Sequence, residues 1–211
     1  MNDNPHALEW SNFRKNTDAH TLSVLHEDGV YRHLKMAEGD SNIWSWEIVT
    51  FPGSLVFRGD IGKGYIFTRE WDMVPFFNTN KWGLTPYEDG APVVDFAYWA
   101  EKLSDPSSAY SFSLSKVKEI IKEQGTWRGW DTSYMERVLF AADLLDTEQE
   151  AQEFLRDLFQ DDFEVRGFDI YFLYTCYAID KILRAYFKYS VDEVIREWVA
   201  KENTRSQQAG I

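Results

Sequence analysis

The chain is poor in cysteine, in long apolar runs and in positive charge. Cys176 is the only cysteine among 211 residues, so neither an internal disulfide framework nor a zinc site built from cysteines can form. Cys176 lies within an apolar run, where a thiolate is disfavoured, and no GxSxG motif supplies a serine nucleophile. These absences predict a reducing compartment, and they identify no catalytic residue and no cofactor.

Membrane segments and export signals are also missing from the pattern. No stretch reaches the roughly 18 uncharged apolar residues that a membrane span requires. The first ten residues are polar and hold Asp3 and Glu9, unlike the basic region and apolar stretch of a secretory signal. We therefore expect a cytoplasmic protein with no membrane partner.

Acidic residues outnumber basic ones, with 35 Asp and Glu against 22 Lys and Arg and a formal net charge of −13. Nucleic-acid phosphates and anionic lipids repel such a chain, so direct nucleic-acid binding is not expected. Solubility is the common reason for acidity of this size. The alternative is an acidic face that docks on a basic protein and imitates the nucleic acid which that protein binds.

The apolar content is large enough for a packed core, since 44% of the residues are hydrophobic and 17% are aromatic. The pattern predicts one α+β domain over residues 1–211, in which a four-stranded antiparallel meander near the N-terminus packs against a C-terminal helical bundle. The sheet-rich part is expected over about 1–104 and the helical part over about 105–205. Residues 203–211 are polar and are expected to fray.

The strands are predicted from alternation with period two. Residues 6–27 come first and predict a short helix, which a polar stretch at 16–18 interrupts. Turn signals rich in glycine then separate four alternating segments, which favours an antiparallel meander. The predicted strands cover residues 30–36, 43–51, 55–58 and 65–68. Alternation in the second strand places Trp44, Trp46 and Ile48 on one apolar face, which helices must cover.

Helices are predicted over the rest of the chain from caps and from apolar spacing. Short helices are expected over 72–77 and 95–103, and at least five more after residue 112. Thr147 with Glu150 matches a capping box. The segment 170–186 is apolar nearly all round and is expected to be the central helix of the bundle. The residues expected to start the five later helices are Ser113 or Ser115, Asp131, Thr147, Asp169 and Ser190.

Negative charge is concentrated between residues 131 and 164, where eleven carboxylates stand against two arginines. On helices these residues would form one or two negative ridges, either a solvated face or a docking surface for a basic partner. The candidate partner-binding residues are Glu136, Asp143, Asp146, Glu150, Glu153, Asp157, Asp161 and Asp162.

A phosphate-binding site is the alternative hypothesis. By its parity Arg32 points toward the apolar side of its strand, where a guanidinium needs a carboxylate or a ligand oxygen. Asp60 is either that partner or the residue that nucleates a turn. The glycines from Gly59 to Gly64 match no phosphate-loop motif and serve the turn. The residues of this alternative site are Arg32, Arg58, Asp60, Lys63, Trp82, Trp127 and Trp130.

All four histidines lie within the first 33 residues. Their spacings match no helical ligand pair and no HExxH motif, so no metal site is predicted. We expect surface or hydrogen-bonded structural histidines at His6, His20, His26 and His33.

Five short motifs carry a resemblance to a known family. They are Leu25–Leu34 (LHEDGVYRHL), Ile48–Gly53 (IVTFPG), Gly59–Gly62 (GDIG), Phe67–Phe77 (FTR, DM and FF) and Tyr98–Leu103 (YWAEKL). Together they resemble a family of bacteriophage and prophage proteins with no established activity, over roughly residues 20–103. The resemblance implies a phage accessory protein acting in a bacterial host cytoplasm, and it assigns no catalytic residue.

In that setting the leading hypothesis is an acidic decoy that binds and inhibits a nucleic-acid-binding defence protein of the host. The alternative is a protein that binds a nucleotide or a related phosphate ligand, as a sponge or as a small-molecule enzyme. A third possibility is a structural or replication accessory without a ligand. The oligomeric state is left open.

Overall fold

The computed structural model describes residues 4–79 and 85–208, and the chain forms two compact units. Unit 1 joins residues 1–104 to 173–211, and unit 2 consists of Asp105–Phe172. The change from sheet-rich to helical sequence predicted at about residue 104 coincides with the end of the first segment of unit 1. The helical part was expected to continue to 205, whereas residues from Leu173 onward belong to unit 1.

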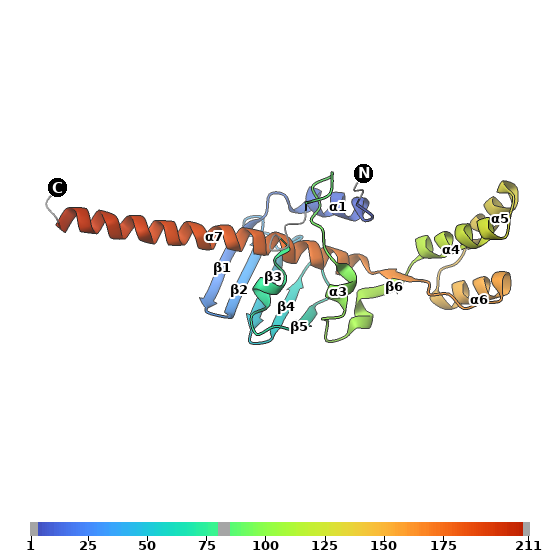
Figure 1. Ribbon diagram of the computed structural model, residues 1–211, viewed down its shortest axis with the longest axis horizontal. Helices are drawn as coiled ribbons and strands as arrows, with labels where there is room; N and C mark the ends of the chain where they lie inside the picture. The colour runs from blue at the N-terminus through green and yellow to red at the C-terminus, as the bar shows by residue number, and fades with distance from the viewer. Residues whose placement is uncertain (1–3, 80–84, 209–211) are drawn as a thin grey trace. The chain divides into compact units, whose positions relative to one another are not determined.

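Unit 1 is built on an antiparallel sheet of five strands that lie side by side in chain order (Figure 1). The α+β class and the meander predicted from the sequence are therefore confirmed, with one strand more than expected. The strands are β1 (Thr21–Asp28), β2 (Tyr31–Ala37), β3 (Trp46–Phe51), β4 (Ser54–Gly59) and β5 (Tyr65–Thr68).

The additional strand, β1, replaces the second half of the helix predicted over 6–27. Only α1 (Ala7–Thr17) is helical in that range. Gly29, with a φ of +58°, lies in the two-residue turn between the paired residues Asp28 and Tyr31. The prediction was wrong because leucines spaced three apart suit a helix locally, while pairing with β2 satisfies the same backbone groups over a longer range.

The inward face of the sheet carries the core of unit 1. Trp46 and Ile48 of β3 are buried there with no exposed surface, as the alternation predicts. Trp44 differs from the prediction, because it precedes β3 and has a left-handed φ of +56°. Its backbone N–H donates to the Asp60 carboxylate at 2.9 Å, which helps to hold this unusual conformation.

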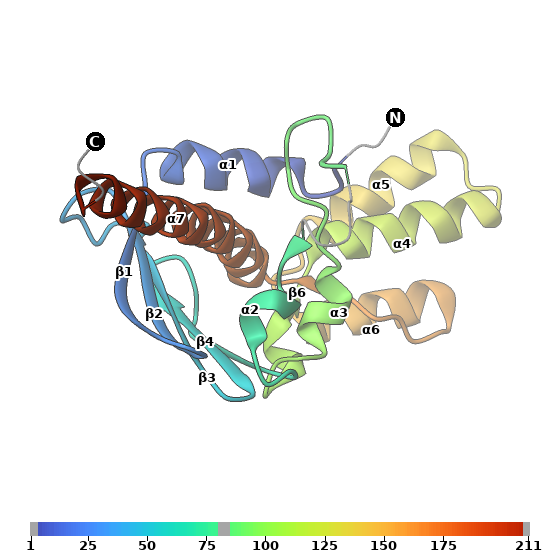
Figure 2. The same cartoon turned by 60° about the vertical axis from the view of Figure 1, so that its left-hand side comes forward.

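Two helices, α1 and α7 (Ile170–Gln208), cover this inward face (Figures 1 and 2). The ring of Phe13 in α1 lies 5.9 Å from the ring of Trp46 and 5.9 Å from that of Tyr177 in α7. The apolar segment 170–186 is thus helical as predicted. Its position was predicted wrongly, because most of it covers the sheet of unit 1 and does not form the centre of a helical bundle.

Helix α7 is continuous, so the separate helix predicted to start at Ser190 does not exist. The Ser190 hydroxyl donates to the Tyr186 carbonyl at 3.1 Å within the helix, a bond that Ser makes in helix interiors as well as at caps. The helix runs through Gln208. It therefore includes most of the tail expected to fray, and residues 209–211 lie outside the described part of the chain.

Two short helices, α2 (Met73–Phe76) and α3 (Phe96–Ala100), follow the sheet in unit 1. Each begins at a predicted aspartate: the Asp72 carboxylate accepts from the Val74 N–H, and the Asp95 carboxylate accepts from the Tyr98 N–H. Helices were predicted over 72–77 and 95–103, and the structure shows in addition that the first residue of each range is the cap.

Unit 2 is a small helical unit closed by a two-stranded ribbon, with a capped start for each helix. Ser113, Asp131 and Thr147 accept backbone N–H bonds at the starts of α4, α5 and α6 as predicted. A single apolar core lies between these helices. The elements are the 3-10 helix Pro106–Ala109, β6 (Tyr110–Phe112), α4 (Leu114–Trp127), α5 (Thr132–Ala142), α6 (Glu148–Phe159) and β7 (Arg166–Phe168).

The backbones of β3 and β4 pack closely at Gly59, where a side chain would not fit. A Cβ at this position would approach the Ser45 carbonyl oxygen and lie 2.6 Å from Trp46 Cα, and its φ is +150°. Both of these neighbours are backbone atoms of the adjacent strand region and cannot move aside as a flexible side chain can. We therefore expect Gly59→Ala to lower the free energy of unfolding by about 3 kcal/mol. The control Gly64→Ala, with a φ of +81° and open space around it, should cost about 1 kcal/mol. Urea unfolding measures both, and equal costs would contradict this account of the packing.

Candidate functional site

The predicted acidic docking surface lies on α6 of unit 2. Its first turn is a capping box, in which the Thr147 hydroxyl accepts from the Glu150 N–H at 3.2 Å and the Glu150 carboxylate accepts from the Thr147 N–H at 3.0 Å. Ala151, Leu155 and Phe159 are buried in the core. The helix is thereby fixed with its polar side outward.

One line of carboxylates occupies that polar side. Glu150, Glu153 and Asp157 are exposed and spaced three and four residues apart, so they share one helical face. Asp146 precedes the helix and Asp161 follows it, and both are exposed. Within the described part of unit 2, no Lys or Arg forms an ion pair with any of these five. We call the set Asp146, Glu150, Glu153, Asp157 and Asp161 the α6 ridge.

Glu150 is ionised more readily than an isolated glutamate. The backbone N–H of Asp146 and the side chain and backbone of Thr147 donate to its carboxylate, and these hydrogen bonds lower its pKa.

Other predicted partner-binding residues are neutralised or stand apart from the ridge. Asp143 pairs with Lys118 of α4, and Asp162 pairs with Arg156 at 2.8 Å. Glu136 is exposed on α5, a different helix. The predicted set is therefore divided: five of its eight members form the ridge.

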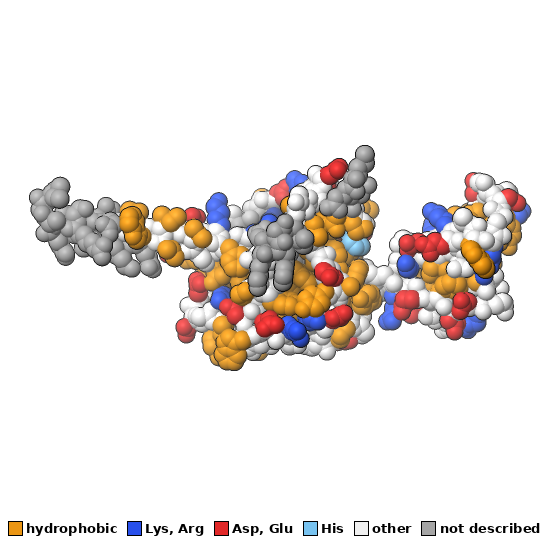
Figure 3. All heavy atoms as spheres, viewed as in Figure 1, with side chains coloured by type: hydrophobic (Ala, Val, Ile, Leu, Met, Phe, Trp, Pro, Cys, Tyr) orange, Lys and Arg blue, Asp and Glu red, His pale blue; other side chains and the backbone are white. Residues whose placement is uncertain are grey.

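Unit 2 remains acidic as a whole, because its sequence holds 15 acidic and seven basic residues, a net charge of −8. Acidic and basic side chains are interspersed on the face of this unit seen in Figure 3. Arg166 contributes to that mixture by pairing with Glu148 at 3.7 Å and with Glu164 at 3.1 Å. Fewer carboxylates are thus without a basic partner than the sequence count between residues 131 and 164 indicates.

Arg32, the first residue of the alternative phosphate site, already has a carboxylate partner. Its Nη1 and Nη2 atoms donate to the two Asp72 oxygens, each at 3.0 Å, and its Nε donates to the Tyr186 hydroxyl at 3.1 Å. Tyr186 in turn donates to Glu27. Burial opposes the charge, but the bonds to Asp72 and Tyr186 outweigh it and raise the pKa of Arg32.

The need for a carboxylate at Arg32 is therefore met by Asp72 and not by Asp60. Asp60 binds the Trp44 N–H at the turn after β4, in agreement with the turn interpretation. Arg58 binds Glu47 at 2.7 Å on the outward face of the sheet, opposite to the face of Arg32. These three residues do not meet in one site.

The remaining candidates of the phosphate site are also dispersed. Lys63 is exposed between β4 and β5. Trp127 and Trp130 belong to unit 2, where Trp127 is exposed and Trp130 stacks on Phe159 at 5.5 Å. Trp82 lies outside the described residues. The structure therefore brings no described pair of these basic and tryptophan residues together.

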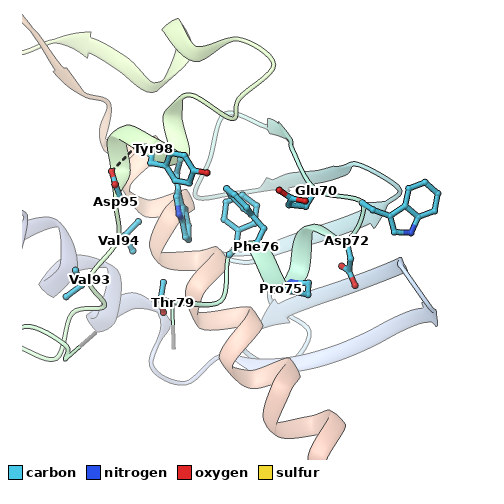
Figure 4. Close-up of a pocket in the computed structure, with 12 residues that line it drawn as sticks. Glu70, Asp72, Pro75, Phe76, Thr79, Val93, Val94, Asp95 and Tyr98 are labelled. Atoms are coloured by element: carbon cyan, nitrogen blue, oxygen red, sulfur yellow. Dashed lines mark hydrogen bonds between the residues drawn. The ribbon is translucent and has the colours of Figure 1, made fainter. Parts of the chain in front are cut away.

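A pocket of unit 1 lies at α2 and α3 and has a volume of about 750 Å³ (Figure 4). Aromatic side chains of both helices, among them Phe76 and Tyr98, line it together with three carboxylates, Glu70, Asp72 and Asp95. A phosphate in this pocket would face negative charge. Its lining suits apolar or cationic groups, and it offers no support for the nucleotide alternative.

The four histidines occupy separate environments. His20 is buried and stacks on Trp46 with ring centroids 5.5 Å apart, while His33 lies 2.9 Å from Glu47 on the outward face. His6 contacts the edge of Phe96, and His26 pairs across the strands with His33. Over residues 4–79 and 85–208, no group of three or more His, Cys, Asp or Glu side chains could hold a metal ion.

The network of Glu27, Tyr186, Arg32 and Asp72 was not predicted. Asp72 carries a local signal, because it precedes a short helix as a cap. Its pairing with Arg32 joins residues 40 positions apart, and no spacing rule reveals such a contact. The exposed Trp71, beside this network, also escaped the sequence reasoning.

No family model, no curated protein and no solved structure matches the chain. The resemblance to phage and prophage proteins therefore stays a prediction. In the described residues, no helix is both long enough and apolar enough to cross a membrane.

The Arg32–Asp72 pair should be coupled energetically, because the exposed fractions of the two side chains are only 12% and 27%. We expect Arg32→Met and Asp72→Asn each to cost about 2 kcal/mol, and the double variant to cost at least about 1 kcal/mol less than their sum. Urea unfolding of the four proteins measures the coupling. Arg58→Met is the control, because the Arg58 side chain is 67% exposed, and it should cost under about 1 kcal/mol. Additive losses at Arg32 and Asp72 would refute the coupling.

Cys176 should be chemically silent in the native protein. Burial raises the pKa of its thiol well above the ordinary value, and the residue has no exposed surface. We expect iodoacetamide at pH 8 to leave the folded protein unmodified and to alkylate it fully in urea, as mass spectrometry can show. Rapid labelling without denaturant would mean that α7 opens locally.

Proposed function

We propose that this protein binds a basic, nucleic-acid-binding protein through the α6 ridge and keeps nucleic acid from its partner. The observation that carries the proposal is the α6 ridge, three exposed carboxylates on one face of α6 and one at each end of the helix, with no ion pair to Lys or Arg in the described part of unit 2. Other carboxylates of the unit are paired with Lys or Arg. A protein that binds phosphates presents the complementary charge.

The dimensions of the ridge support this partner. From Glu150 to Asp157, seven steps at 1.5 Å per helical residue span about 10 Å. These three carboxylates therefore follow one another at axial intervals of roughly 4–6 Å, somewhat longer than the rise of about 3.4 Å per phosphate of one nucleic-acid strand. The charge density is lower than that of a duplex, which carries one charge per about 1.7 Å. Recognition would therefore depend on position along a line and would weaken with salt.

The class of partner is an inference from the expected setting. A phage accessory protein in a bacterial host cytoplasm, which the sequence resemblance implies, gains from blocking a host defence protein that binds nucleic acid. The proposal is accordingly an anti-defence inhibitor without catalysis, cofactor or direct nucleic-acid contact.

Charge reversal on the ridge tests the proposal. The variant carries Glu153→Lys, Asp157→Lys and Asp161→Lys, and leaves Glu150 in place because it closes the capping box. The control carries Glu38→Lys, Asp40→Lys and Glu88→Lys, which are exposed in unit 1 and change the net charge equally. Wild type, variant and control serve as parallel baits in a bacterial extract, with the recovered proteins identified by mass spectrometry.

We expect wild type and control to recover the same basic nucleic-acid-binding protein, with an affinity that falls as salt rises. The ridge variant should bind the purified partner about 10- to 100-fold more weakly, and duplex DNA or RNA should compete with wild type. If variant and control lost affinity for the partner equally, binding would depend on net charge alone and the proposed role of the ridge would be wrong. A partner that nucleic acid does not displace would refute the decoy mechanism.

A further inference from the structure

The distal part of α7 exposes a row of apolar side chains. Val191, Val194, Ile195, Trp198 and Val199 are 58%, 67%, 54%, 64% and 46% exposed. In Figure 1 this part of the helix continues past the sheet of unit 1, and Figure 3 shows apolar side chains gathered along it. We call these five residues the α7 stripe.

The stripe follows helical geometry closely. Its members are spaced one, three or four residues apart, so they share one face of α7, as residues of a coiled-coil seam do. Glu193 and Arg196 lie on the other side of the helix, where Arg196 pairs with Glu193. Helices owe most of their stability in water to burial of an apolar face, and among the described residues nothing covers this one.

Charge distinguishes this segment from the rest of the protein. Residues 188–205 contain four basic and four acidic residues, so the segment is neutral in a chain whose formal net charge is −13. Two copies can approach here without the repulsion that opposes contact elsewhere. A segment without net positive charge also lacks the excess of lysines and arginines that holds amphipathic helices on anionic lipids. The basic residues of the segment are Lys188, Arg196, Lys201 and Arg205, and the acidic ones are Asp192, Glu193, Glu197 and Glu202.

We infer that the α7 stripe packs against the same stripe of a second copy, so that the protein forms a two-fold dimer. Burying the exposed parts of these five side chains in both copies removes about 800 Å² of surface, where stable interfaces bury about 1,200–2,000 Å². The aliphatic parts of the side chains that flank the stripe on each helix add to this buried area. We therefore expect a weak dimer that dissociates at roughly micromolar concentrations.

Sedimentation velocity across roughly 1–100 µM tests the dimer. Wild type should shift from monomer to dimer, and Val194→Gln with Trp198→Gln should shift the midpoint at least about tenfold upward. The matched control, Trp127→Gln with Phe140→Gln, removes exposed apolar side chains from helices of unit 2 and should dimerise as wild type does. Circular dichroism verifies that all variants are folded.

A second measurement locates the contact by cysteine crosslinking. Because Cys176 is buried, Val194→Cys introduces a single exposed thiol on the stripe, and Glu193→Cys introduces one on the opposite side of the helix. Oxidation should give a covalent dimer with the former and at least about tenfold less with the latter.

A wild-type protein that remains monomeric at the highest concentration would overturn the inference. A dimer that persists unchanged in the Val194→Gln, Trp198→Gln variant, or equal crosslinking at both cysteine positions, would overturn it as well. Neither outcome depends on the α6 ridge, because no partner protein is present in these measurements.

Discussion

Burial of one apolar face of the sheet is the constraint on which the rest of unit 1 depends. Strands β2 to β5 alternate buried and more exposed side chains, and the buried ones, which are mostly apolar, form a continuous surface that water must not reach. Helices α1 and α7 supply the cover, and Phe13, Trp46 and Tyr177 meet at the contact. Tyr177 of α7, 145 residues after Arg32 in the chain, is thereby held against the sheet to which Arg32 belongs.

That cover brings polar groups together at the border of the core. Tyr186 of α7 reaches Arg32 of β2, and Asp72 completes the pair while it caps α2. An isolated guanidinium would be costly in this position. The network is therefore best understood as part of the packing between helix and sheet, in which the charge of this arginine is already paired with a carboxylate.

The acidity of the chain has two different uses. Many carboxylates of unit 2 hold the unit together, as helix caps such as Asp131 or as partners of Lys118 and Arg156. The five carboxylates of the α6 ridge are exposed and form no ion pair with Lys or Arg in the described part of unit 2. The neutral α7 stripe has the opposite character, and a dimer formed there would present two ridges to a partner, which raises avidity without any new contact.

The sequence by itself determined the α+β class, the strands β2 to β5 and the helix caps, because alternation, turn glycines and capping residues act over a few positions. Tertiary structure alone decided the rest. Residues 21–28 form a strand because their backbone groups pair with those of β2. Most of α7 belongs to unit 1 because its apolar residues cover the apolar face of the sheet. The Arg32–Asp72 pair and the division of carboxylates into paired and unpaired ones follow from contacts between distant residues, which no local pattern encodes.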